Sequence, residues 1–181
     1  MTRPTRRAVL GAIGGTATAV AGCLGTDSGD GNDGDAASEG GDWRTASLTD
    51  VTTGESFSIS ELEAPVLAHP FAVWCSTCGR QNEAIDALQS ENDFEVVQLN
   101  IGDDEGRDRV REYAEENGYA EHSRFAVAPE GVSRALVDEF GAAAVSPPQS
   151  PVVLLCSDGT THEIDKIAPP ETILSAVENS C

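Results

Sequence analysis

The feature that most constrains this fold is an apolar run that leads directly into a pair of closely spaced cysteines. Residues 66–73 are mostly apolar and suit a buried strand, and the motif Trp-Cys-Ser-Thr-Cys follows at positions 74–78. Two cysteines three positions apart in the first turn of a helix lie on one face and can form a disulfide. The free N–H groups and the dipole of that turn favour a thiolate over a thiol. This junction predicts a strand followed by a helix that carries redox-active sulfurs at its start.

The two cysteines differ in their expected roles. Cys75 is nearer the helix terminus, so we expect it to attack a substrate disulfide, and Cys78 then resolves the mixed disulfide. Trp74 is expected to shield and shape the site. A C-x-x-C motif alone also makes half of a zinc site, but the sequence supplies no second pair of ligands.

Short apolar runs alternate with amphipathic stretches beyond Trp43. The pattern predicts a mixed α/β sheet with helices on both faces. A leading hairpin is expected in 46–59, turning at Thr53-Gly54. The expected strands are 66–73, 94–101, 124–128, 152–156 and 160–167, and the expected helices are the one after Cys75, 107–117, 132–140 and the one that begins at Pro169-Pro170.

The chain is strongly acidic. It has 181 residues, with 11 basic and 31 acidic ones, for a net charge of −20, and Lys166 is its only lysine. Nucleic acid is therefore excluded as an expected partner. At molar salt the Debye length falls to about 3 Å, which screens the self-repulsion of such a chain. Because acidic residues recur throughout 42–178, the composition indicates a halophilic protein rather than one with a single acidic tail.

The N-terminal segment has the pattern of an export signal. Residues 5–10, Thr-Arg-Arg-Ala-Val-Leu, resemble a twin-arginine signal, and 20–23, Val-Ala-Gly-Cys, resemble a lipoprotein processing site. We expect residues 1–22 to be a signal peptide and Cys23 to carry a lipid, although an uncleaved N-terminal anchor is also compatible. Residues 23–42 are expected to be an acidic flexible linker, and 43–181 the folded domain. Both alternatives place the domain at the outer face of the cell membrane.

Taken together, residues 46–181 resemble the thioredoxin superfamily, in particular the membrane-tethered thiol-disulfide oxidoreductases of the TlpA type, here as a haloarchaeal-type lipoprotein. The features that carry the resemblance are the leading hairpin, the cysteine motif, an inserted strand and helix at 124–140, and a proline before the strand that starts at Val152. The resemblance implies a cis-proline loop at Ser150-Pro151 that docks substrate. Pro147 and Pro148 are competing candidates for this proline.

The sequence departs from the family pattern at two places near the cysteines. Many relatives have an acidic or amide residue six positions before the first cysteine, where this chain has His69. This histidine could transfer protons, could stabilise the Cys75 thiolate as a cation, or could be a hydrogen-bonded strand residue with no chemical role. Pro70 beside it predicts a bulge or local distortion of the strand. The second departure is Ser76-Thr77, because relatives in the family have a proline between the two cysteines. The dipeptide at this position strongly influences the reduction potential of the pair, so the sequence leaves open whether the protein reduces or oxidises its partners.

Two further cysteines remain once Cys23 is assigned to a lipid and the motif pair to redox chemistry. In an exported protein, Cys156 and Cys181 could form a structural disulfide, or Cys156 could be a buried small apolar residue.

Three other functional classes differ from disulfide exchange in the residues that they require. A copper chaperone of this fold would use Cys75, Cys78 and His162, although such proteins space their cysteines C-x-x-x-C. A peroxidase would need a Pro and Thr before its reactive cysteine, and both are absent. A redox-silent binding domain would not need the cysteine pair.

The sequence therefore predicts a thiol-disulfide oxidoreductase that needs no cofactor and no metal. Its expected partners are protein thiols and disulfides, the membrane through the lipid on Cys23, and an upstream electron donor or acceptor that could itself be a membrane protein.

Overall fold

A computed structural model describes residues 41–181. The predicted signal peptide and most of the predicted linker, including Cys23, lie outside these residues. The strands are β1 Leu48–Thr49, β2 Ser56–Phe57, β3 Val66–Phe71, β4 Glu95–Asn100, β5 Arg124–Val127, β6 Val152–Leu155 and β7 Thr161–Ile164. The helices are α1 Ser76–Gln89, α2 Arg107–Glu116, α3 Glu130–Phe140 and α4 Pro170–Ser180.

The central sheet is mixed, as the sequence predicts. Its strand order is β5-β4-β3-β6-β7. β3 is parallel to β4, and β4 to β5, whereas β6 is antiparallel to both β3 and β7. The predicted leading hairpin forms as the separate antiparallel pair β1-β2. β3 is therefore the central strand, and α1 leaves from its carboxyl end.

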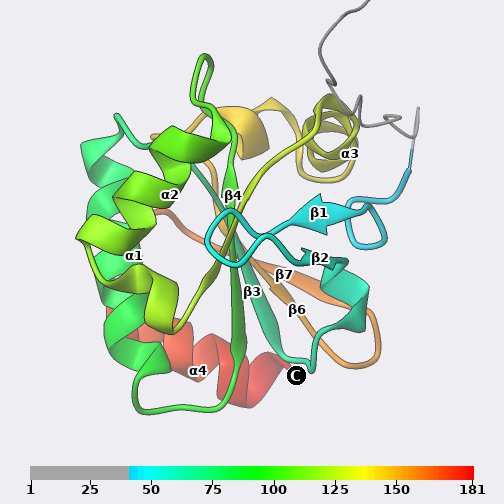
Figure 1. The fold of residues 1–181 in the computed structure, drawn as a ribbon. Coiled ribbons are helices and arrows are strands. Elements are labelled where there is room, and N and C mark those ends of the chain that lie inside the picture. The colour runs from blue at the N-terminus through cyan, green and yellow to red at the C-terminus, as the bar shows by residue number, and fades with distance from the viewer. Residues whose placement is uncertain (1–40) are drawn as a thin grey trace, which may run out of the picture. The chain divides into compact units, whose positions relative to one another are not determined.

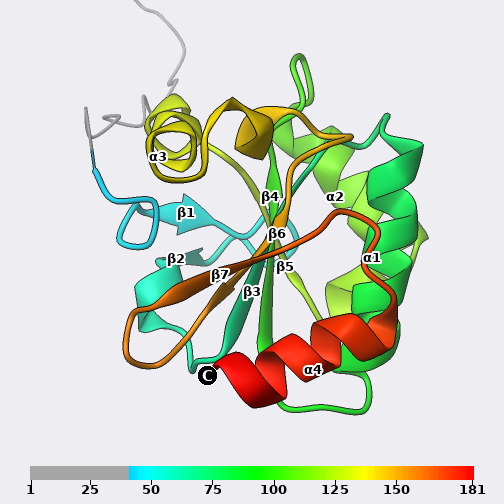
Figure 2. The same ribbon diagram turned by 180° about the vertical axis from the view of Figure 1, so that it is seen from behind.

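Helices cover both faces of this sheet. Successive side chains of a strand point to opposite faces, so the apolar strands present residues to both layers of helices. On one face, Leu67 of β3 packs with Ile85 of α1 and Ile173 of α4. On the other face, Ala68 packs with Val132 and Leu136 of α3. Figures 1 and 2 show α1, α2 and α4 on the first side and α3 on the second. The predicted fold class is confirmed.

Local sequence signals mark the helix boundaries. α4 begins with Pro170, whose missing N–H has no intrahelical partner in the first turn anyway. Gly118 and Gly141 follow the ends of α2 and α3 with φ angles of 76° and 80°, which a residue with a Cβ rarely adopts. Within residues 41–181, no helix is long and apolar enough to span a membrane.

Pro70 does not form a bulge, because β3 stays paired on one side, but the local distortion that the sequence predicted as the alternative is present on the β6 side. β3 pairs with β4 without a break from Val66 to Phe71. On its other side, pairing with β6 stops at Ala68, opposite Val153. Two steps further in this register, Pro70 would face Pro151, and neither residue has an N–H for the ladder. The sheet therefore opens between β3 and β6 next to the cysteine motif.

Candidate functional site

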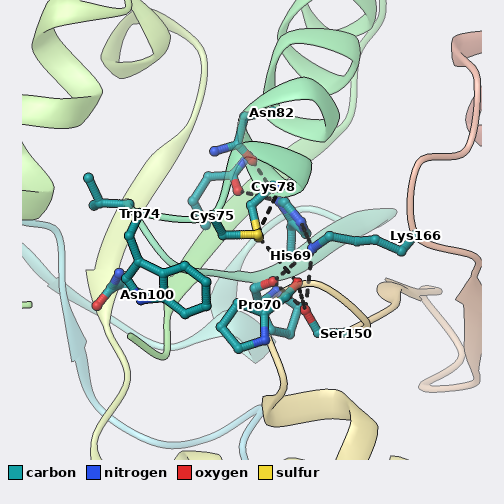
Figure 3. The surroundings of a disulfide bond; sticks show 12 residues. His69, Pro70, Trp74, Cys75, Cys78, Asn82, Asn100, Ser150 and Lys166 are labelled. Atoms are coloured by element: carbon teal, nitrogen blue, oxygen red, sulfur yellow. Dashed lines mark hydrogen bonds between the residues drawn. A yellow bond between two sulfur atoms is a disulfide. The ribbon is translucent and has the colours of Figure 1, made fainter. Parts of the chain in front are cut away.

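The cysteine pair lies where β3 passes into α1, and the two sulfurs form a disulfide (Figure 3). Cys75 is the N-cap residue of α1 and Cys78 lies in its first turn, with 5.2 Å between their Cα atoms. The backbone N–H of Cys78 donates to Sγ of Cys75 at 3.2 Å. N–H groups in the first turn of a helix have no acceptor within the helix, so this N–H is available to Cys75. After reduction it would stabilise negative charge on the sulfur of Cys75.

The two cysteines differ in exposure, although both are largely covered. Cys75 is 4% exposed and Cys78 is 0% exposed, whereas the preceding Trp74 is 62% exposed. Sγ of Cys78 lies 3.2 Å from the carbonyl oxygen of Pro147. Cys75 is therefore the sulfur nearer to solvent, and Cys78 is the inner sulfur.

Glu105 holds the segment that presents Trp74 and Cys75. Its carboxylate accepts hydrogen bonds from the backbone N–H groups of Val73 at 2.8 Å and Trp74 at 3.1 Å. Nδ2 of Asn100 donates to the same carboxylate at 2.6 Å. Sequence reasoning missed Glu105, because one acidic residue in a loop of an acidic chain carries no distinguishing signal.

A polar network lies behind the disulfide, centred on the fully buried His69. Its Nδ1 is 2.7 Å from Oδ1 of Asn82 and 2.9 Å from Oε1 of Gln98. Nδ2 of Asn82 donates to the hydroxyl of Tyr113 at 3.1 Å, so the oxygen of this amide faces the imidazole. Nδ1 therefore carries the proton, and Nε2 accepts from Nζ of Lys166 at 2.7 Å.

Burial shapes the protonation of this network. It lowers the pKa of His69 from 6.5 to about 3, aided by the charge of Lys166 and opposed by the hydrogen bonds to Gln98 and Asn82. Burial also lowers the pKa of Lys166 from 10.5 to about 7. His69 is neutral near pH 7, so the prediction that it stabilises the Cys75 thiolate as a cation is wrong. Its role in proton transfer stays a prediction.

The predicted cis bond at Ser150-Pro151 is also wrong. Within residues 41–181 the cis peptide bond is Ala64–Pro65. The N–H of Ser150 donates to the carbonyl of Ser146 at 2.8 Å, which closes a turn, and its hydroxyl donates to the carbonyl of Pro70 at 2.7 Å. This turn directs the side chain of Ser150 into the opening between β3 and β6. Ser150 and Pro151 are buried, and substrate docking by this loop stays a prediction.

The ligand set of the copper alternative does not assemble. His162 lies on the edge strand β7, opposite Leu154. Among the residues that the structure describes, no group of three or more His, Cys, Asp and Glu side chains could hold a metal ion, so Cys75, Cys78 and His162 do not form one.

The remaining two cysteines form a second disulfide. Cys156 follows β6 and Cys181 follows α4, and their Cα atoms are 5.2 Å apart. Of the two alternatives for Cys156, the structural bridge is the one observed. It ties the end of α4 to the central sheet.

Comparison with known proteins identifies the fold. No described protein family and no curated protein matches the sequence. A thio-disulfide isomerase from Thermus thermophilus is similar in structure, with a TM-score of 0.60, 16% identity, and coverage of 77% of this chain and 94% of that one. A thioredoxin-related protein from Neisseria meningitidis has a TM-score of 0.59 and 15% identity, covering 72% and 96%. A SCO1/SenC family lipoprotein from Bacillus anthracis has a TM-score of 0.58 and 15% identity, covering 76% and 93%.

These similarities define a class of fold. The chain has a thioredoxin-like fold, and its disulfide lies at the start of the helix that follows the central strand. Sequence reasoning anticipated this pair, whereas it missed Lys166, Asn82 and Gln98 as partners of His69. The single available signal was that Lys166 is the only lysine in the chain.

Proposed function

We propose that this protein is an extracytoplasmic thiol-disulfide oxidoreductase that exchanges disulfides with protein substrates through Cys75 and Cys78. The observation that carries the proposal is the asymmetry of the pair. Cys75 receives a backbone N–H and lies nearer to solvent, whereas Cys78 is fully buried behind it. The similarity to a thio-disulfide isomerase and a thioredoxin-related protein supports the same activity.

Disulfide exchange proceeds in two displacements. In the reducing direction, the Cys75 thiolate attacks one sulfur of a substrate disulfide, and the other substrate sulfur leaves as a thiolate and takes up a proton. Cys78 then loses its proton and attacks Sγ of Cys75, which releases the second substrate thiolate. Two electrons pass to the substrate, and the Cys75–Cys78 disulfide forms. A dithiol protein upstream reduces it again, and an oxidising enzyme runs the same steps in reverse.

The proposed location depends on the sequence of the N-terminal segment. The twin-arginine pattern and Cys23 support export followed by attachment through a lipid, which places the domain at the outer face of the membrane. The Cys156–Cys181 disulfide supports an oxidising compartment outside the cytoplasm. The proposed partners are therefore thiols and disulfides of other exported proteins.

Two cysteine variants test the exchange activity. We expect Cys75→Ser to abolish reduction of a protein disulfide, and Cys78→Ser to accumulate mixed disulfides between Cys75 and its substrates. The Cys156→Ala/Cys181→Ala double variant is the matched control, because it removes the other disulfide and leaves the proposed site intact. Full activity of Cys75→Ser, or a metal-loaded Cys78→Ser protein without linked partners, would overturn the proposal.

A further inference from the structure

Lys166, the only lysine of this chain, lies in the turn between β7 and α4 and points toward the disulfide (Figure 3). Its side chain enters the opening between β3 and β6. There Nζ lies 2.7 Å from Nε2 of His69, 3.3 Å from the carbonyl oxygen of Pro70 and 3.3 Å from Oγ of Ser150. These three acceptors match the three N–H donors that the amine has once it is protonated.

The residue after Lys166 has an unfavourable backbone conformation. This residue, Ile167, has a φ angle of 62° and is 47% exposed. A β-branched residue rarely adopts that conformation, and its own side chain gains little burial from it. Gln81 of α1 fixes the following residue, because its Oε1 accepts from the N–H of Ala168 at 3.0 Å. The unfavourable φ angle of Ile167 is therefore not explained by burial of its own side chain. It occurs next to the residue whose side chain enters the opening, Lys166.

The buried end of Lys166 has no anionic partner in the oxidised protein. All three acceptors are neutral, and no carboxylate of residues 41–181 forms an ion pair with it, although the chain has 31 acidic residues. Among the described residues, the titratable group that contacts it is His69 from β3, whereas the neighbouring Asp165 is exposed. The cysteine pair at the start of α1 titrates only after the disulfide is reduced. Burying a cation without a counter-ion is unfavourable, which favours the neutral amine in the oxidised protein. A nearby anion formed during the reaction would stabilise the protonated form.

Reduction of the disulfide creates such an anion. We propose that Lys166 is the charge partner of the thiolate that forms when the Cys75–Cys78 disulfide is reduced. This inference rests on the proposed function. Two substrate thiols give up two electrons and two protons to the protein. One proton remains on the second cysteine as a thiol, the other is bound by the amine of Lys166, and the thiolate and the ammonium form together.

A chain of contacts connects Lys166 to the inner sulfur. Oγ of Ser150, which is 3.3 Å from Nζ, lies 3.1 Å from the carbonyl oxygen of Pro147. The same carbonyl is 3.2 Å from Sγ of Cys78. A protonated Cys78 in the reduced protein can donate to this carbonyl, which leaves the negative charge on Cys75. The lowered pKa of Lys166, about 7, allows its amine to take up a proton near neutral pH.

The wild-type protein allows a direct test, since lysine labelled with ¹³C at Cε gives one side-chain resonance. We expect the pKa of Lys166 to be about one unit higher in the reduced protein than in the oxidised one, a tenfold tighter binding of the proton. The Cys75→Ser/Cys78→Ser variant, exposed to the same reductant, should show no shift. An equal Lys166 pKa in both redox states of the wild type would overturn the inference.

Two substitutions provide a second readout. Lys166→Met should raise the pKa of the Cys75 thiol by about one unit, measured from thiolate absorbance, and lower the equilibrium constant for reduction about tenfold, or ~30 mV. Lys166→Arg keeps the cation and should lie closer to the wild type. A folded Lys166→Met protein with the wild-type thiol pKa would contradict the inference. An unchanged thiol pKa in Lys166→Met would refute only the role of Lys166, provided that the wild-type protein exchanges disulfides. A wild-type protein that does not exchange disulfides would refute the proposed function.

Discussion

The buried His69 makes a quantitative prediction about stability in acid. Its pKa is about 3 in the folded protein and 6.5 in the unfolded chain. Between these values the unfolded chain binds more protons than the folded protein, so the free energy of unfolding falls as the pH is lowered through this window. The contribution of His69 is fully present above pH 6.5. Protonation of the unfolded chain removes it progressively toward pH 3.

The size of this effect follows from the two pKa values. One pH unit inside the window is equivalent to about 1.36 kcal/mol. From pH 7.5 to pH 4, His69 alone should therefore lower the free energy of unfolding by about 3 kcal/mol. Because the His69 side chain is fully buried, solvent does not screen it, and the whole contribution to the free energy of unfolding is expected.

Denaturant unfolding at constant high salt measures this contribution through the fluorescence of the two tryptophans. His69→Asn replaces the imidazole with a neutral group, so the difference in pH dependence between wild type and variant isolates His69 from the carboxylates. His162→Asn, on the edge strand β7, is the control and should keep the wild-type slope. Equal slopes for wild type and His69→Asn between pH 7.5 and 4 would refute the assignment of a neutral buried histidine.

Three other predictions concern the rest of the domain. Replacing Cys156 and Cys181 with alanine opens a loop of 25 residues and should lower the free energy of unfolding by about 3.5 kcal/mol in denaturant titrations, and unchanged stability would contradict a structural role. Glu105→Gln weakens the charged hydrogen bonds to the segment before Cys75, so we expect a loss of about 2 kcal/mol and a changed alkylation rate of Cys75. Glu112→Gln, on the exposed face of α2, is its control, and equal effects of the two variants would show that Glu105 has no special role. Because the net charge is −20, lowering the salt concentration should unfold the domain cooperatively in circular dichroism, and a domain equally stable in dilute buffer would refute the halophilic interpretation.

The features that sequence reasoning predicted are those set by local patterns. The apolar run before Trp74 and the spacing of the cysteines suffice to place a strand, a helix and a disulfide, because each depends on residues close in sequence. Gly118 and Pro170 mark helix boundaries for the same reason. These elements could be predicted without knowledge of how the chain packs.

The features that were missed depend on contacts between distant parts of the chain. Lys166 and His69 are 97 positions apart and meet only because β6 is antiparallel to β3, so β7 leads back to the open end of the sheet. The hydrogen bond from the hydroxyl of Ser150 to the carbonyl of Pro70 likewise joins residues 80 positions apart across the same opening. No short sequence window contains either interaction.

A redox titration of the wild-type protein tests the central claim most directly. The protein is equilibrated over a series of dithiol and disulfide ratios in high salt, the free thiols are alkylated, and mass spectrometry assigns each cysteine. We predict that Cys75 and Cys78 change together in one reversible two-electron transition while Cys156 and Cys181 remain bonded. A Cys75–Cys78 pair that stays in one state at every ratio, or retains a bound metal ion throughout, would contradict the account.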